Sequence, residues 1–176
     1  MNRTTWRLVL LRHAKSAWPE RVADDERPLA ARGLRDAPRA GRWLARNGFV
    51  PDRVVCSPAR RTRETWRLAG GALGGSPPVG HDERLYGAGL GELLTIVGET
   101  AEEVRTLLLV GHEPGMSELT LRLAGSGEGD ALVRVRTKFP TCALAVLELP
   151  VPWREIAADT AVLRAFVIPR DPAMDA

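Results

Sequence analysis

The sequence predicts an α/β fold, a three-layer α/β/α arrangement around a mostly parallel sheet. Apolar runs of strand length alternate with stretches of helical spacing along the chain. Polar residues capable of chemistry directly follow several of these runs. The 176 residues suit one domain, and a chain of this length can bury a core without disulfides or structural metals. We expect a single domain over residues 1–170 and a flexible tail over 171–176.

The elements follow from the local patterns. The expected strands are the apolar runs at 6–11, 54–56, 106–110, 143–149 and 162–168. Helical spacing predicts helices over about 34–45, 57–69, 91–97 and 114–125. Ser57 is expected to cap the second helix, with Pro58 at its first position. Pro38 is expected near the start of the first helix or at a kink. Polar residues 28–32 and the Gly/Pro-rich stretch 70–78 are expected to be loops.

The two cysteines, Cys56 and Cys142, both stand beside apolar sequence typical of strands. Catalytic cysteine chemistry requires a nearby base or an anion-binding loop after the thiol, and the Ser-Pro that follows Cys56 is not such a loop. We therefore expect two buried, reduced thiols.

Composition excludes several classes of partner. The net charge is +3, but the 25 basic residues are scattered among 22 acidic ones and aromatic residues make up only 5% of the chain. No basic stripe with interleaved aromatic residues is present, so we expect no nucleic-acid partner. No apolar run approaches the ~20 residues of a membrane span, and no signal-peptide pattern opens the chain. We expect a cytoplasmic protein with no membrane partner.

Three segments carry residues suited to phosphate chemistry, and each follows a predicted strand. Arg12 and His13 combine a guanidinium that matches phosphate oxygens with an imidazole that is mostly neutral at pH 7 and can attack phosphorus. The second predicted helix carries Arg60 and Arg61 near its start, where the helix N-terminus already favours anions. His112 follows the strand at 106–110. Because parallel strands end at one edge of the sheet, we expect the three segments to form one phosphate site.

These segments resemble the signature segments of the histidine phosphatase superfamily, in the same order. They read Leu-Arg-His-Ala-Lys-Ser at 11–16, Ser-Pro-Ala-Arg-Arg-Thr-Arg-Glu-Thr at 57–65 and Gly-His-Glu-Pro-Gly-Met-Ser-Glu-Leu at 111–119. The family's triad has Gly where this chain has Ala14, and this variant resembles the short SixA-like branch. Segments 28–33 and 138–141 also resemble sequences of that branch. The resemblance covers about residues 8–149 and implies a phosphoglycerate mutase-like fold. The Arg61 helix and the His112 strand are too close in sequence for a large cap domain.

The resemblance implies roles for particular residues. The catalytic residues that it implies are His13 as the nucleophile, with Arg12, Arg61 and His112 around the phosphoryl group. Arg61 rather than Arg60 stands four positions after Ser57, as the family's motif requires. Lys15 and Ser16, on the loop after the nucleophile, are expected to help bind the substrate. In-line attack would give a phosphohistidine enzyme that water hydrolyses, and no metal or cofactor is expected because arginines supply the positive charge.

The leaving group decides between two substrates. An alkoxide requires a general acid, for which Glu83 is the main candidate and Asp82 a weaker one. Glu83 resembles the acid of mutase-like relatives but is equally consistent with a solvated surface carboxylate. Imidazole leaves readily without an acid, so an open site suits protein phosphohistidine, the substrate reported for SixA-like relatives. A general phosphomonoesterase acting on small metabolites and a non-catalytic phosphate-binding module remain alternatives, and the oligomeric state is left open.

Overall fold

The computed structural model describes residues 5–172 as seven strands, five α-helices and three short 3₁₀ helices. The strands are β1 (Trp6–Arg12), β2 (Arg53–Cys56), β3 (Val79–His81), β4 (Thr106–Gly111), β5 (Ala124–Gly127), β6 (Leu144–Leu149) and β7 (Ala161–Val167). The helices are α1 (Ala31–Arg46), α2 (Arg60–Gly71), α3 (Leu90–Gly98), α4 (Gly115–Leu123) and α5 (Ala131–Thr137). The 3₁₀ helices are η1 (Asp24–Glu26), η2 (Glu83–Leu85) and η3 (Trp153–Glu155).

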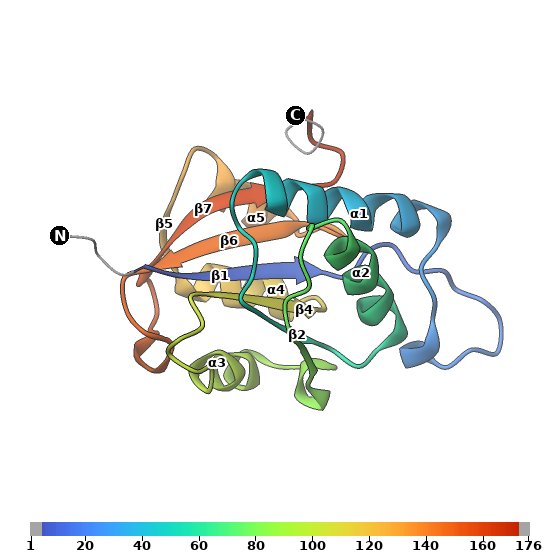
Figure 1. The fold of residues 1–176 in the computed structure, drawn as a ribbon, viewed down its shortest axis with the longest axis horizontal. Coiled ribbons are helices and arrows are strands. Elements are labelled where there is room, and N and C mark those ends of the chain that lie inside the picture. The colour runs from blue at the N-terminus through green and yellow to red at the C-terminus, as the bar shows by residue number, and fades with distance from the viewer. Residues whose placement is uncertain (1–4, 173–176) are drawn as a thin grey trace.

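The strands form one sheet in the order β3-β2-β4-β1-β6-β7-β5 (Figure 1). Strands β2, β4 and β1 are paired in parallel, and β6 runs antiparallel to its neighbours β1 and β7. The predicted mostly parallel sheet is confirmed. The central position of β1 and β4 brings their carboxyl ends together at the middle of one sheet edge.

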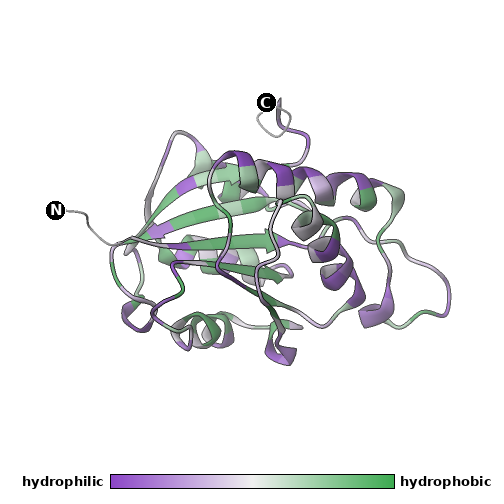
Figure 2. Ribbon diagram, viewed as in Figure 1, coloured by the Kyte–Doolittle hydropathy of each residue, from purple (hydrophilic) through white to green (hydrophobic). Residues whose placement is uncertain are grey.

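Helices cover both faces of the sheet and give the predicted three layers. Along β1, Leu8 and Leu10 pack with the apolar side chains of α3, α4 and α5, whereas Val9 and Leu11 pack with those of α1 and α2. This alternation explains why the run is continuously apolar, because a strand covered on both faces needs apolar residues at every position. Figure 2 shows the hydrophobic strands at the centre and hydrophilic residues on the outer helices.

The start of α2 differs from the prediction. The helix begins at Arg60 with Ala59 as its N-cap residue and no side-chain cap. Ser57 and Pro58 precede the helix, so assigning them to the N-cap and the first helical position was wrong. The Ser57 hydroxyl instead contacts the ring of His112 at 2.8 Å, an interaction that the local sequence could not indicate.

Pro38 lies inside α1, which begins at Ala31, so the expected position near the start was wrong and the loop at 28–32 is shorter than predicted. Pro38 has no N–H to donate to the carbonyl of Leu34 one turn earlier. Leu34 is 47% exposed, so water can reach that side of the helix. The helix therefore continues through the proline.

The short segments β3, β5 and α5 were not predicted. β3 has three residues and β5 reads Ala-Gly-Ser-Gly, so neither carries an apolar pattern. Only β3, η2 and α3 lie between α2 and β4, in keeping with the absence of a large cap domain. Within the predicted tail, Asp171 is ion-paired with Arg134 of α5, and residues 173–176 lie outside the described part of the chain. No helix among residues 5–172 is both long and apolar enough to cross a bilayer.

Candidate active site

The carboxyl ends of β2, β4 and β1 bring the three predicted segments together. The backbone N–H of His13 donates to the carbonyl of Gly111 at 3.0 Å, and that of Ser57 donates to the carbonyl of Val110 at 3.0 Å. Backbone pairing between neighbouring strands therefore extends to the first residue after β1 and the first residue after β2. It places the residues that follow these strands side by side. The three segments therefore lie together at this sheet edge, and their binding of phosphate remains a prediction.

His13 is held in one tautomer. The residue is 8% exposed, and its Nδ1 lies 2.8 Å from the carbonyl oxygen of Ala14. A carbonyl only accepts hydrogen bonds, so Nδ1 carries the proton. The lone pair is then on Nε2, the nitrogen able to attack phosphorus.

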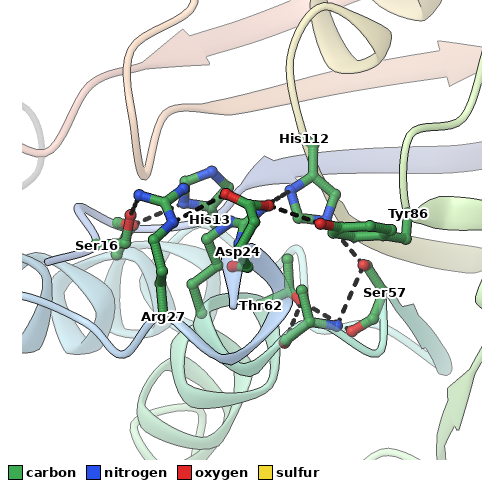
Figure 3. Close-up of polar contacts among 11 residues, drawn as sticks. His13, Ser16, Asp24, Arg27, Ser57, Thr62, Tyr86 and His112 are labelled. Carbon is green, nitrogen blue, oxygen red and sulfur yellow. Dashed lines mark hydrogen bonds and ion pairs between the residues drawn. The ribbon is translucent and has the colours of Figure 1, made fainter. Parts of the chain in front are cut away.

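His112 lies beside His13, with ring centroids 5.3 Å apart. Its Nδ1 is 3.4 Å from Nη2 of Arg61, and its Nε2 is 2.8 Å from Oγ of Ser57 (Figure 3). A guanidinium only donates, so Nδ1 accepts and Nε2 carries the proton that Ser57 accepts. The two rings thus have opposite tautomers in one site.

Both imidazoles are held neutral. Burial, the largest cause, together with the positive charges of Arg61 and Arg12, lowers the pKa of His13 to about 3. Burial and then Arg61 lower the pKa of His112 to about 4. His13 therefore has its lone pair available at neutral pH, and positive charge stands around it for an anion.

In an NMR titration from pH 8 to pH 5, both rings should stay neutral. The ¹⁵N shifts should show the Nδ1–H tautomer for His13 and the Nε2–H tautomer for His112. A His81→Asn variant removes the remaining histidine and completes the assignment. Unfolded histidines take up protons near pH 6.5, so the free energy of unfolding should fall by up to about 1.4 kcal/mol per pH unit per ring below that pH, toward pH 4. A midpoint near 6.5 for folded His13 would contradict the assigned environment.

Arg61 is buried, and Thr65 links it to the nucleophile loop. The Thr65 hydroxyl donates to the carbonyl of Arg61 at 2.6 Å and accepts from the N–H of Ala14 at 2.9 Å. Thr65 is completely buried, so no water competes for these bonds. The position of the Arg61 helix is thereby tied to the residue next to His13.

Asp24 is a site residue that the sequence did not reveal. Its carboxylate accepts from the Tyr86 hydroxyl at 2.6 Å and pairs with Nη2 of Arg61 at 3.0 Å (Figure 3). The hydrogen bond from Tyr86, followed by the charge of Arg61, lowers the pKa of Asp24 to about 2. Tyr86 also packs edge-on against His112, with centroids 5.6 Å apart. In the sequence, Asp24 belongs to an Asp-Asp-Glu run typical of a solvated loop, and only the fold brings it to Arg61.

The other residues of the nucleophile loop have separate contacts. The Arg12 guanidinium donates to the carbonyl of Phe139 at 2.7 Å and is close enough to lower the pKa of both histidines. The Ser16 hydroxyl accepts from Arg27 at 3.1 Å, and Ser16 pairs through its backbone with Leu29. Lys15 lines an open groove beside Arg12. Ser16 thus has a structural partner, and a substrate contact for either residue remains a prediction.

The candidate general acids lie on and before η2. Glu83 is exposed, and within residues 5–172 its carboxylate makes no hydrogen bond or ion pair with Arg12, His13, Arg61 or His112. Asp82 accepts from the backbone of Arg84 and pairs with its side chain, which lowers the pKa of Asp82. An acid must hold a proton before it can donate one, so Asp82 is poorly suited to the role.

The remaining candidate groups are accounted for by packing. Cys56 and Cys142 are free and buried, as predicted, and burial raises the pKa of both thiols, to about 12 for Cys56. Within residues 5–172, no group of three or more His, Cys, Asp and Glu residues is arranged to hold a metal ion.

Comparison with known proteins identifies this arrangement. Residues 8–110 match the model of the histidine phosphatase superfamily (branch 1), and the match includes His13 and Arg61. The chain belongs to the histidine phosphatase superfamily. It is a phosphatase whose reaction depends on histidine.

Several relatives are similar to this phosphatase over nearly its whole length. An uncharacterised protein of Mycobacterium tuberculosis is 44% identical over 91% of this chain and 100% of its own length. The structure of a protein assigned as the phosphohistidine phosphatase SixA of Nakamurella multipartitia is 33% identical, with a TM-score of 0.82 over 95% of this chain and 98% of the other. A corresponding protein of Agrobacterium tumefaciens is 29% identical, with a TM-score of 0.77 over 93% and 98% of the two chains. The resemblance to the SixA-like branch is confirmed.

Proposed function

We propose that this phosphatase hydrolyses phosphohistidine on proteins through a phosphohistidine intermediate on His13. The observation that carries the proposal is the buried, neutral His13, whose Nε2 is free while Nδ1 is bound to the Ala14 carbonyl. The neighbouring Arg61 and His112 are placed to surround a phosphoryl group at that nitrogen. The assignment of the two similar structures as SixA proteins supports the same substrate.

The reaction balances in two displacements. The Nε2 lone pair of His13 forms a bond to phosphorus while the bond from phosphorus to the substrate nitrogen breaks, and the departing imidazole takes a proton from solvent. Arg12 and Arg61 stabilise the negative charge on the phosphoryl oxygens, and His112 can donate to one of them once its Nε2–H turns from Ser57 to the phosphoryl group. Water then attacks phosphorus, the bond to His13 breaks, and inorganic phosphate leaves.

The free site already holds a counter-ion for Arg61. Asp24 accepts from Arg61 through both its backbone carbonyl and its carboxylate. An incoming phosphoryl group has to share these donors or displace the carboxylate. Because the pKa of Asp24 is lowered to about 2, its carboxylate stays ionised at neutral pH. It is therefore a counter-ion rather than a proton donor to the leaving group.

The direct test compares two substrates without added metal. Purified protein should release phosphate both from a phosphohistidine protein and from p-nitrophenyl phosphate. A chelator should leave both rates unchanged, whereas vanadate and inorganic phosphate should compete. Failure to hydrolyse the phosphohistidine protein, with p-nitrophenyl phosphate hydrolysed, would favour the small-metabolite alternative.

Glu83→Gln separates the two substrate classes. We expect kcat/KM for phosphohistidine to change less than about twofold, because imidazole departs without a dedicated acid and the described residues include no hydrogen-bond or ion-pair partner of the Glu83 carboxylate. If Glu83 serves an ester as general acid, hydrolysis of an alkyl phosphate should fall by about 10²-fold or more. Glu103→Gln is a matched control, since Glu103 is also exposed. A large loss on phosphohistidine in Glu83→Gln alone would contradict the acid-independent mechanism.

A further inference from the structure

A second cationic feature lies next to the phosphoryl site. A groove of about 410 Å³ runs from the nucleophile loop to the segment after β7. We call it the lysine groove, because it is lined by Lys15 and Lys138, the only lysines of the chain, together with Arg12, Arg32, Asp36 and Arg170. Five of these six side chains are cationic and one is acidic.

The positive charge of the lysine groove is left largely uncompensated. Arg32 pairs with Asp36 at 4.0 Å and Arg12 is near the carboxylate of Glu113, but within residues 5–172 no carboxylate pairs with Lys15, Lys138 or Arg170. Lys138 and Arg170 are exposed and Lys15 is half-buried, so an anion brought by a ligand can reach their positive charges.

The groove is built into the fold on its nucleophile side. The carbonyl of Lys15 accepts from the N–H of Ala30 at 2.8 Å, and a Cβ on Gly33 would lie 2.3 Å from that carbonyl. The backbone of Lys15 is therefore fixed against the first turn of α1, which carries Arg32. Arg12 lines the groove and is the residue directly before His13 in the chain, so the groove lies beside the phosphoryl site.

We propose that the lysine groove binds an acidic side chain that flanks the phosphohistidine of a substrate polypeptide. This inference rests on the proposed function and extends it to substrate choice. The groove has more room than one carboxylate fills and is open, so a segment of extended polypeptide can enter it. Its charge would attract acidic segments and orient the phosphorylated side chain toward His13. The segment 138–141, which follows the SixA-like pattern, thereby gains a role as one wall of the groove.

The test uses two phosphohistidine peptides of equal length, one with Asp and Glu beside the phosphohistidine and one with Asn and Gln. The wild-type protein should favour the acidic peptide by about five- to tenfold in kcat/KM, and the preference should shrink at high salt. The double variant Lys138→Gln, Arg170→Gln should lose the preference. Its hydrolysis of p-nitrophenyl phosphate, which has no second anionic group, should stay unchanged.

A matched control is Arg136→Gln, which removes an exposed charge two residues from Lys138 and outside the groove lining. It should keep the preference for the acidic peptide. Equal rates on the two peptides with the wild-type protein would overturn the groove assignment and leave the phosphatase proposal intact. A preference for sugar bisphosphates over monophosphates, without one for the acidic peptide, would also overturn it. If the wild-type protein hydrolysed neither peptide nor p-nitrophenyl phosphate, the proposed function itself would be overturned.

Discussion

His13→Ala should lower hydrolysis of p-nitrophenyl phosphate by on the order of 10⁴-fold or more, because the variant lacks the nitrogen that attacks phosphorus. The fold should be retained, since His13 follows β1 and the strand's apolar side chains supply the packing. Circular dichroism and thermal unfolding check this second expectation. A loss of turnover with an unchanged circular dichroism spectrum and Tm indicates a missing nucleophile rather than an unfolded protein.

The covalent intermediate provides an independent measurement. Rapid quenching with labelled substrate should trap label that is stable in base and labile in acid, located on His13 by peptide mapping. His81→Asn is the matched control, because His81 lies on exposed β3 and should not affect the trapped label. Near-wild-type turnover in His13→Ala, or label on a serine or aspartate, would disprove the assignment.

Gly41→Ala should cause the largest loss of stability from a single added methyl group. A Cβ at position 41 would lie 1.9 Å from the carbonyl oxygen of Ala69, so α1 and α2 cannot keep their present separation. Alanine favours a helix over glycine by about 1 kcal/mol, but overpacking against backbone costs about 3 kcal/mol, so the clash outweighs the propensity. The net loss of about 2 kcal/mol should lower Tm by roughly 4–8 °C.

Gly91→Ala is the matched control for this prediction. Gly91 lies in α3, and a Cβ there meets no atom within 4 Å. This substitution should raise stability by up to about 1 kcal/mol through helix propensity alone. Denaturant and thermal unfolding of both variants give the comparison, and an unchanged or higher Tm in Gly41→Ala would contradict the close helix contact.

The sequence was sufficient for the parts of the site that follow strands. The proximity of the segments that carry His13, Arg61 and His112 could be predicted because each segment comes soon after an apolar run, and parallel strands end at one edge; the choice of Arg61 over Arg60 needed the family motif. Asp24 could not, because its partner Arg61 is 37 residues away and no local pattern links them. The Ser57 hydroxyl was assigned to a helix cap, since a Ser-Pro pair usually begins a helix, but here tertiary contact with His112 outweighs that local preference.

The same distinction applies to the fold. The buried strands β1 and β4 have continuous apolar runs and were predicted closely, whereas β3 and β5 are held by pairing with neighbouring strands. Pro38 was misplaced because sequence rules treat a helical proline as a break, without reference to which side of the helix faces water. These errors arise from tertiary context rather than from an incorrect fold class.

The hydrogen bonds of Thr65 couple two parts of the catalytic machinery mechanically. The Thr65 hydroxyl joins the backbone of Ala14, next to His13, to the backbone of Arg61. A displacement of α2 is therefore expected to move the loop that carries His13 in the same direction. The distance between His13 and Arg61, on which stabilisation of the negative charge in the proposed reaction depends, is thereby maintained.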